Sequence, residues 1–329
     1  MIRVAILGAA HPHVSYALDE VAARENCTLV AVAEPDPDMQ AAHLPDIGDT
    51  PRYDSPAELL AAHQVDVALV AGVYSRRGAA VIAALEAGAH VVADKPLCTS
   101  LDELNQIEEL AAAAHRHVSV VFEKRFYPAT LALRDLLEDG TLGRPALMAS
   151  TGPHKLNLPN RPAWFLDRST YGGIAGDLPV HDIDLALILS GATSGTVSAI
   201  TGNARAADHP RFDDHVAVLL HAGDLTATIE ANWLAPQAAD VHGHYRMRLA
   251  GTNGTAELDW AYDAVTVTTH GEPRRQVDLP PGRRPAAYFF DAVAAGHEPE
   301  ITTAQSVLAT RVALLAQDSA DHDGAPRHW

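Results

Sequence analysis

The stretch IRVAILGAAHPH, residues 2–13, decides the fold of this 329-residue chain. Its first six residues are an almost unbroken apolar run, and Gly8, two alanines and a polar turn follow. Runs of this length, bounded by turn residues, are typical of strands that are buried on both faces of a sheet. No extended basic segment precedes the run, so we interpret it as a first strand and not as a signal peptide.

Short apolar runs recur along the first 122 residues, and helical stretches separate them. The further runs lie at 28–33, 65–70, 90–93 and 118–122, with helices expected at 14–24, 56–63, 77–87 and 100–115. Strand and helix in alternation are the signature of a parallel sheet with right-handed crossovers. The sequence therefore predicts an α/β fold whose N-terminal domain, residues 1–123, is built on a doubly wound parallel sheet.

After residue 125 the pattern changes. A helix expected at 129–137 is followed by runs with partial alternation, and Ala222-Gly223-Asp224 and Asn253-Gly254 separate neighbouring runs as hairpin turns do. The strands are expected at 146–151, 197–201, 215–221, 225–232, 245–250, 255–260 and 264–269. We expect a C-terminal α/β domain, residues 124–329, with a large and mainly antiparallel open sheet. A closing helix at 303–320 is expected to pack back between the domains.

The composition narrows the classes of partner. Apolar residues make up 47% of the chain, which excludes a disordered protein. The net charge of −18 argues against nucleic acid and against an anionic membrane face, and it leaves small molecules as partners. No run of eighteen apolar residues predicts a membrane span. Cys27 and Cys98 form neither a disulfide framework nor a zinc knuckle, so we expect a reducing, cytoplasmic setting.

Gly8-Ala9-Ala10-His11-Pro12-His13 stands where a dinucleotide fold places Gly-x-Gly-x-x-Gly before a helix. Only the first glycine is present, and His13 replaces the third, which normally permits close packing of helix on strand. The free amides and the dipole of a helix N-terminus bind phosphate whatever the side chains are. We therefore expect these six residues to contact the pyrophosphate of the cofactor.

Glu34 follows the second strand, 26 positions after Gly8, where a carboxylate hydrogen-bonds the adenosine ribose of NAD. No arginine follows it directly to receive a 2′-phosphate, so we expect NAD, with NADP second. The alternative interpretation makes Glu34 an acid that caps a loop.

Two pairs of alternating histidines, His11-x-His13 and His242-x-His244, raise the question of a metal. Such pairs can share one face of a strand, but neither has a third ligand nearby in the sequence, and His11-Pro12 lies in a turn. We expect no metal site.

Asp94-Lys95-Pro96 stands where the strand at 90–93 ends, and the chain has only three lysines, at 95, 124 and 155. Side chains at the carboxyl ends of strands in open α/β sheets point into the crevice where ligands bind. Pro96 restricts the backbone at Lys95. Taken alone, the tripeptide favours the simpler interpretation of a lysine that reaches solvent.

A second segment, GGIAGDLPVHDID at 172–184, precedes an apolar helical run. Asp177 and His181 are four residues apart and His181 and Asp184 three apart, so in a helix they would share one face. A carboxylate beside an imidazole raises its basicity and orients it, as a general base near neutral pH requires. The alternative makes Asp177 a helix N-cap and His181 a satisfied helix histidine.

Together these segments resemble the glucose-fructose oxidoreductase and inositol dehydrogenase family, Gfo/Idh/MocA. The resemblance covers most of the chain, in the order ALEAGAHVVADKPL (84–97), FEKRFYPA (122–129), GRPALM (143–148), RPAWFLD (161–167), GGIAGDLPVHDID (172–184) and LAGTNGTAELD (249–259). It implies that residues 1–123 are a Rossmann domain that binds NAD(P). It also implies that the chain is an NAD(P)-dependent dehydrogenase or reductase acting on a CH–OH group of a sugar, sugar derivative or cyclitol. It also implies a homodimer or homotetramer formed through the C-terminal sheet.

The resemblance also implies roles for individual residues. Lys95 matches the lysine of the family's Glu-Lys-Pro, Asp177 its active-site aspartate and His181 its catalytic histidine, while Asp94 replaces the usual glutamate. Where the family has Thr-Pro-Asn and a later histidine, this chain has Gly72, Val73, Tyr74 and Arg77, which with Asp94 and Lys95 are expected beside the cofactor. Contacts with the substrate are expected from Lys95, Arg125, His154, Lys155, Trp164, Asp177, His181 and Tyr245.

Two other activities fit the same residues. One is glycoside cleavage or elimination through transient oxidation, which needs the same lysine, aspartate and histidine. The other is a sensor of sugars or nucleotides that has lost turnover. The altered glycine loop favours the sensor, and the retention of Lys95, Asp177 and His181 counts against it.

Overall fold

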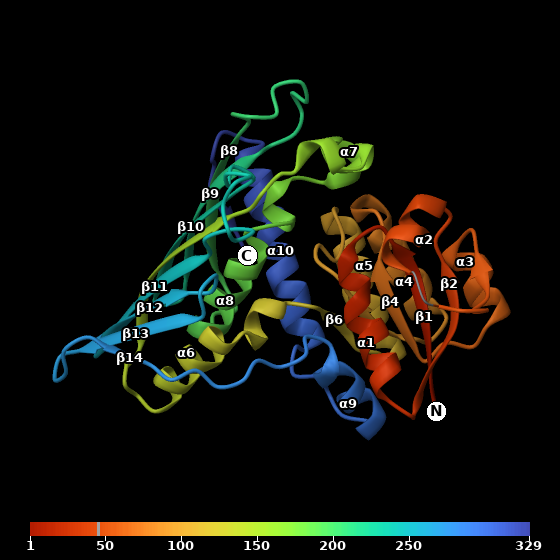
Figure 1. The fold of residues 1–329 in the computed structure, drawn as a ribbon, viewed down its shortest axis with the longest axis horizontal. Helices are drawn as coiled ribbons and strands as arrows, with labels where there is room; N and C mark the ends of the chain where they lie inside the picture. Colours follow the sequence, from red (N-terminus) through yellow and green to blue (C-terminus); the bar gives the residue numbers. More distant parts are fainter. Residues whose placement is uncertain (45–46) are drawn as a thin grey trace. The chain divides into compact units, whose positions relative to one another are not determined.

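The computed structural model describes residues 1–44 and 47–329, which form two compact units. The first unit comprises Met1–Val121, Ser169–Gly172 and Arg284–Thr310, and the second comprises Phe122–Arg168, Gly173–Arg283 and Arg311–Trp329. Each unit is built around one sheet of its own (Figure 1).

A six-stranded parallel sheet forms the centre of the first unit, with the order β3-β2-β1-β4-β5-β6. Its central strands are continuously apolar because both of their faces are covered, and β4 is buried along its whole length. The doubly wound sheet predicted from the sequence is confirmed. The strands are β1 (Ile2–Ala9), β2 (Cys27–Ala33), β3 (Arg52–Tyr53), β4 (Val67–Ala71), β5 (His90–Ala93) and β6 (Val118–Val120).

The helices of the first unit begin at residues whose side chains satisfy free backbone amides. Ser55 accepts a hydrogen bond from the amide of Glu58 at the start of α3, and Ser100 accepts from two amides at the start of α5. Asp36 caps α2, a helix that the sequence analysis did not predict. The helices are η1 (Pro12–Val14), α1 (Ser15–Ala23), α2 (Pro37–His43), α3 (Pro56–Ala62), α4 (Tyr74–Glu86) and α5 (Leu101–Ala114).

A segment from late in the chain completes the first unit. It carries α9 (Ala287–Ala295) and the beginning of α10 (Thr303–Ala320), whose bounds match the predicted helix. The hydroxyl of Ser119 in β6 lies 2.6 Å from the hydroxyl of Tyr288, and the Ser306 hydroxyl accepts from the amide of Val120 at 3.0 Å. The edge strand β6 is therefore covered rather than left open.

The second unit holds a nine-stranded sheet with the order β14-β13-β12-β11-β7-β10-β9-β8-β15. Neighbouring strands are antiparallel except β7 and β10, which are parallel. The mainly antiparallel sheet is confirmed, with Gly223-Asp224 as a two-residue hairpin turn. The strands are β7 (Pro145–Pro153), β8 (Gly195–Gly202), β9 (His215–Ala222), β10 (Leu225–Asn232), β11 (Arg246–Gly251), β12 (Gly254–Asp259), β13 (Ala264–Thr269), β14 (Arg275–Gln276) and β15 (Arg327–His328).

Helices pack on one face of this sheet. α8 (Val180–Ser190) contacts β7, β9 and β10, and α6 (Pro128–Glu138) contacts β12 and β13. Residues of β9 alternate between buried and exposed, as a strand covered on one face requires. The other face remains exposed and carries Leu147, Ile200 and Leu219, each more than half exposed. No helix in the described part of the chain is both long enough and apolar enough to span a bilayer.

Candidate functional site

The loop after β1 lies directly against the loop after β4. Gly8 has a φ of +88°, and a Cβ at this position would lie 2.5 Å from Cα of Gly72. Only glycine fits such an approach. The amide of His11 also donates to the carbonyl of Ala71 at 3.1 Å. The first glycine of the motif is thus required by the geometry.

Glu34 lies beside this loop, as the sequence predicted. Its Oε2 accepts a hydrogen bond from the amide of Ala9 at 2.6 Å, and its Oε1 accepts from the amide of Asp36 at 3.1 Å. The carboxylate therefore joins the turn after β2 to the loop after β1. The loop-capping interpretation of Glu34 is realised.

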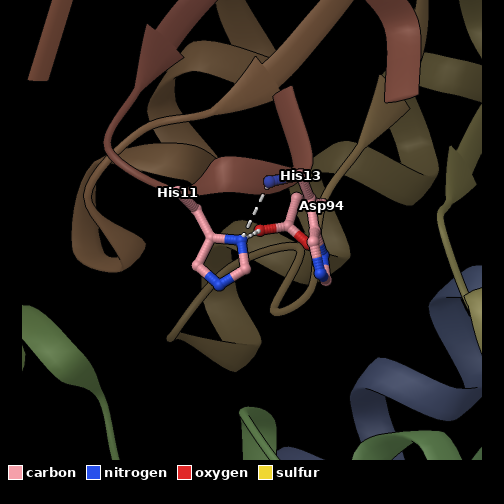
Figure 2. A group of neighbouring side chains, drawn as sticks. All are labelled: His11, His13 and Asp94. Carbon is pink, nitrogen blue, oxygen red and sulfur yellow. Dashed lines mark hydrogen bonds and ion pairs between the residues drawn. The ribbon is translucent and has the colours of Figure 1, made fainter. Parts of the chain in front are cut away.

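Asp94, directly after β5, is buried, and three side chains contact it: His11 and His13, which Figure 2 shows, and Arg77. Its Oδ1 lies 2.8 Å from Nδ1 of His13, and its Oδ2 lies 3.0 Å from Nδ1 of His11 and 2.8 Å from Nη2 of Arg77. Burial alone would raise the pKa of Asp94, but His11, Arg77 and His13 hold it well below its usual range. Because burial lowers the pKa of His11 to about 4, that ring is neutral near pH 7, and Arg77 supplies the permanent positive charge.

Arg77 is fully buried, and each of its three guanidinium nitrogens donates to the protein itself. Nε donates to the carbonyl of Gly72 at 2.8 Å, Nη1 to the carbonyl of Lys95 at 2.5 Å, and Nη2 to Asp94 at 2.8 Å. The guanidinium also lies 4.4 Å from the centre of the Tyr74 ring. Arg77 was expected beside the cofactor. Its guanidinium donates to groups of the loop after β4 and of the loop after β5.

Lys95 and Pro96 follow Asp94, and the carbonyls of both accept hydrogen bonds from Arg77. The side chain of Lys95 is buried, and its charge contributes to the lowered pKa of His11. The alternative of a lysine that simply reaches solvent is therefore not realised. The charge of Lys95 therefore acts on the loop after β1 together with the charges of Asp94 and Arg77.

In the second unit, Asp177 precedes α8 and does not lie within it. It ends the short helix η5 (Ile174–Gly176), and Pro179 is the N-cap of α8, with no side-chain cap. The N-cap interpretation of Asp177 is not realised, and neither is a single helix that carries Asp177, His181 and Asp184. Asp177 and His181 are both buried.

A carboxylate that the sequence analysis missed lies beside His181. Oε1 of Glu123, in η2 (Glu123–Phe126), is 3.4 Å from Nε2 of His181. Burial, together with the charge of Glu123, raises the pKa of Tyr245. The structure thus brings Tyr245, which is half-buried directly before β11, near the buried side chains of Glu123 in η2 and His181 in α8. The block FEKRFYPA contained this signal, but only Arg125 was singled out in it.

Two buried ion pairs tie η2 to α8. Nζ of Lys124 lies 2.9 Å from both carboxylate oxygens of Asp182. Arg125 donates to the two oxygens of Asp184 at 2.7 and 2.5 Å, although burial still raises the pKa of Asp184. Arg125 was expected to contact substrate and Asp184 to face His181, and the structure instead pairs them with each other. These pairs fix the position of Glu123 relative to His181.

The other expected substrate residues divide into two sets. The ring of His154 lies 4.7 Å from that of Tyr245, which places His154 next to the group around Glu123. Nζ of Lys155 donates to the carbonyl of Ala239 at 2.5 Å, and Trp164 contacts Phe165. The structure thus groups His154 and Tyr245 with His181, and it shows other neighbours for Lys155 and Trp164.

The fold supplies the third metal-type ligand that the sequence analysis did not find. His11, His13 and Asp94 place one donor atom each within 4.8 Å of one another. The cluster lies on the phosphate loop beside Arg77, whose guanidinium shares the carboxylate.

Comparison with known proteins agrees with this arrangement. Residues 2–122 match the oxidoreductase family with an NAD-binding Rossmann fold, and residues 130–257 match the GFO/IDH/MocA C-terminal domain. The chain is 25% identical to the scyllo-inositol 2-dehydrogenase (NAD(+)) of Bacillus subtilis over 260 residues, 77% of this chain and 72% of that protein. It is 28% identical to the inositol 2-dehydrogenase of Acidothermus cellulolyticus over 279 residues, 84% of this chain and 78% of that protein.

Among solved structures, a levoglucosan dehydrogenase in complex with NADH and levoglucosan superposes with a TM-score of 0.83. That match covers 99% of each chain at 20% identity, so it supports the fold alone. The two family matches cover most of the chain and agree with both sheets. The chain is therefore a member of the Gfo/Idh/MocA family of NAD-binding oxidoreductases.

Proposed function

We propose that this chain moves a hydride between the nicotinamide of NAD and a secondary alcohol or ketone of a sugar, sugar derivative or cyclitol. The observation that carries the proposal is the setting of Lys95, buried after β5 in the NAD-binding unit and linked to the phosphate loop through Asp94. The named inositol dehydrogenases among its relatives support this substrate class. In this proposal residues 1–123 bind the cofactor, and residues 124–329 bind substrate and form the oligomer.

The residues fit an oxidation of this kind. Gly8, Ala9, Ala10 and the following turn lie beside Glu34 and would hold the pyrophosphate, and bound NAD would supply the hydride acceptor. His181 takes the proton of the substrate hydroxyl, and Asp177 orients His181 or grips the sugar. Lys95 hydrogen-bonds the same oxygen and stabilises the negative charge that develops on it. Arg77 and Arg125 support the site from within the protein, since both donate to buried partners.

A panel of sugars, inositols and keto-sugars, tested with NAD(H) and with NADP(H), examines this proposal. We expect at least one polyol or keto-sugar to be turned over with a matching change in NADH absorbance. Release of an aglycone from a glycoside without net NADH would indicate cleavage through transient oxidation instead. A chain that binds NADH but turns over no member of the panel would favour the sensor.

Glu34 is expected to set the preference for NAD over NADP. Its carboxylate is held against the amide of Ala9 at 2.6 Å, where it repels a 2′-phosphate and accepts from a free ribose hydroxyl. Glu34→Gln keeps the shape and removes the charge, so we expect the ratio of NADH to NADPH affinity to fall by roughly tenfold, about 1.4 kcal/mol. Fluorescence titrations of both cofactors measure the ratio. An unchanged ratio would show that Glu34 only caps the loop.

The exposed face of the nine-stranded sheet is proposed as the oligomer interface. Leu147, Ile200 and Leu219 are 57%, 57% and 52% exposed on neighbouring parts of this face, and exposed apolar patches mark association surfaces. Leu219→Asp is expected to convert a dimer or tetramer into a smaller species, because it places a charge in an apolar contact. Light scattering on a sizing column measures this. Tyr262→Ser, in the turn between β12 and β13, is the control and should leave the mass unchanged.

A further inference from the structure

Two histidines of the phosphate loop are directed at one carboxylate. His13 occupies the place of the third glycine of the motif, and its ring contacts Asp94, Tyr16 and, edge to face at 4.3 Å, the ring of His11. Nδ1 lies 2.8 Å from Oδ1 of Asp94, and the ring stacks on Tyr16 with centroids 4.7 Å apart. Nδ1 of His11 lies 3.0 Å from the other carboxylate oxygen. Because Asp94 is held ionised, it can only accept, and Nδ1 of His13 donates to it. Nδ1 of His11 lies between the other carboxylate oxygen and the backbone amide of His13, 3.4 Å away, and it can pair with only one of these two groups at a time.

The charges around Asp94 favour hydrogen bonds over a bound cation. The guanidinium of Arg77 lies 2.8 Å from Oδ2 of Asp94, and the Lys95 ammonium acts on His11. With His11 neutral, the negative charge of Asp94 therefore faces the two positive charges of Arg77 and Lys95. A divalent ion would add to this positive charge and would have to displace the proton on Nδ1 of His13. The same positive excess suits an anionic pyrophosphate.

Arg77 connects this carboxylate to the backbone of Lys95. Nη2 donates to Asp94, while Nη1 donates to the carbonyls of Lys95 at 2.5 Å and Pro96 at 3.2 Å. Nε holds the carbonyl of Gly72, in the loop that touches Gly8. A continuous set of hydrogen bonds therefore runs from the phosphate loop through Asp94 and Arg77 to Lys95.

We propose that His11 and His13 are positioning residues for Lys95, acting through Asp94 and Arg77. The two histidines hold the phosphate loop against the carboxylate of Asp94. The guanidinium of Arg77 contacts the same carboxylate and holds the carbonyls of Lys95 and Pro96 in place. His13 thus replaces a packing glycine with a side chain that couples the cofactor loop to the proposed catalytic lysine. This inference rests on the proposed role of Lys95.

The test compares His13→Ala with His13→Asn, whose side-chain N–H can replace the Nδ1 donor. Misplacing a catalytic group by about an ångström costs up to roughly 100-fold in rate, so we expect His13→Ala to lower kcat about 10- to 100-fold. The affinity for NADH should stay within about threefold, since phosphate is bound by backbone amides. His13→Asn should restore most of kcat. His43→Ala, at the end of α2, is the matched histidine control and should leave kcat unchanged.

The three lysines of the chain allow a direct measurement of local position. Selective isotopic labelling of lysine yields one side-chain signal for each, and Lys95→Arg identifies the signal of Lys95. In His13→Ala and in His11→Ala we expect the Lys95 signal to move while those of Lys124 and Lys155 remain. A general loss of structure would move all three.

Each other outcome has a distinct meaning. If Lys95→Ala abolishes turnover but His13→Ala changes neither kcat nor the Lys95 signal, the positioning inference is wrong and the proposed function stands. If Lys95→Ala leaves turnover intact, the proposed role of Lys95 is wrong, and the positioning inference that rests on it is wrong as well. A rise in melting temperature with Zn²⁺ that occurs in the wild type and is lost in His13→Ala would identify a metal site and overturn the inference. Should His13→Ala fail to fold, the His13→Asn and His11→Ala variants carry the same comparison.

Discussion

Lys95→Ala is expected to lower turnover by roughly 100- to 1,000-fold, with little change in the affinity for NADH. The ammonium is the group proposed to stabilise negative charge on the substrate oxygen, and a methyl side chain removes that charge. Steady-state kinetics on the best substrate of the panel, together with NADH fluorescence titrations, separate kcat from cofactor binding. Lys95→Arg keeps the positive charge but replaces the compact ammonium by a larger, planar guanidinium, so it should recover only part of the rate.

His181→Ala is expected to be as severe, because a positioned general base contributes roughly 100- to 10,000-fold. Glu123→Gln is the informative companion, since Glu123 lies 3.4 Å from Nε2 of His181. Removing its charge while keeping its shape should lower kcat by a smaller factor than the loss of His181. If wild-type rates persisted in both Lys95→Ala and His181→Ala, the catalytic assignment would be wrong. Equal rates for Glu123→Gln and the wild type would show that the charge of Glu123 does not contribute to turnover.

Asp184→Ala is expected to have the largest effect on stability. Asp184 and Arg125 are a buried pair, with side chains 1% and 4% exposed, and removing one partner leaves a buried charge without compensation. Such losses cost about 3–5 kcal/mol in the free energy of unfolding. Because burial raises the pKa of Asp184 in spite of Arg125, the ion pair itself gains little over its desolvation cost. The double variant Arg125→Met with Asp184→Leu should therefore recover much of the loss.

Tryptophan fluorescence in urea reports the unfolding of the second unit alone and so tests this prediction. All four tryptophans, at 164, 233, 260 and 329, belong to that unit. Asp224→Ala is the control, since Asp224 and Arg144 form an ion pair with both side chains at least two-thirds exposed. Exposed pairs contribute little, so this variant should unfold close to the wild type. A similar shift for Asp184→Ala and Asp224→Ala would contradict the argument from burial.

Local patterns in the sequence predicted the elements well where one physical requirement dominated. Strands buried on both faces must be apolar throughout, and the runs in the first 122 residues became the parallel sheet. The two-residue turn Gly223-Asp224 defined a hairpin. The parallel pairing of β7 with β10 was not predicted, because strands 72 residues apart at their closest ends show no local sign of pairing.

The sequence by itself determined the fold class, the family and the identity of Gly8, Glu34, Lys95 and His181 as residues to examine. Those features depend on short-range spacing and on the order of recognisable blocks. Only the tertiary structure decided which charges meet. It paired Asp184 with Arg125, placed Glu123 beside His181, and gathered His11, His13 and Arg77 around Asp94. The reason is that a buried charge is stabilised by whichever partner the folded backbone brings within a few ångströms, and that distance is unrelated to separation along the chain.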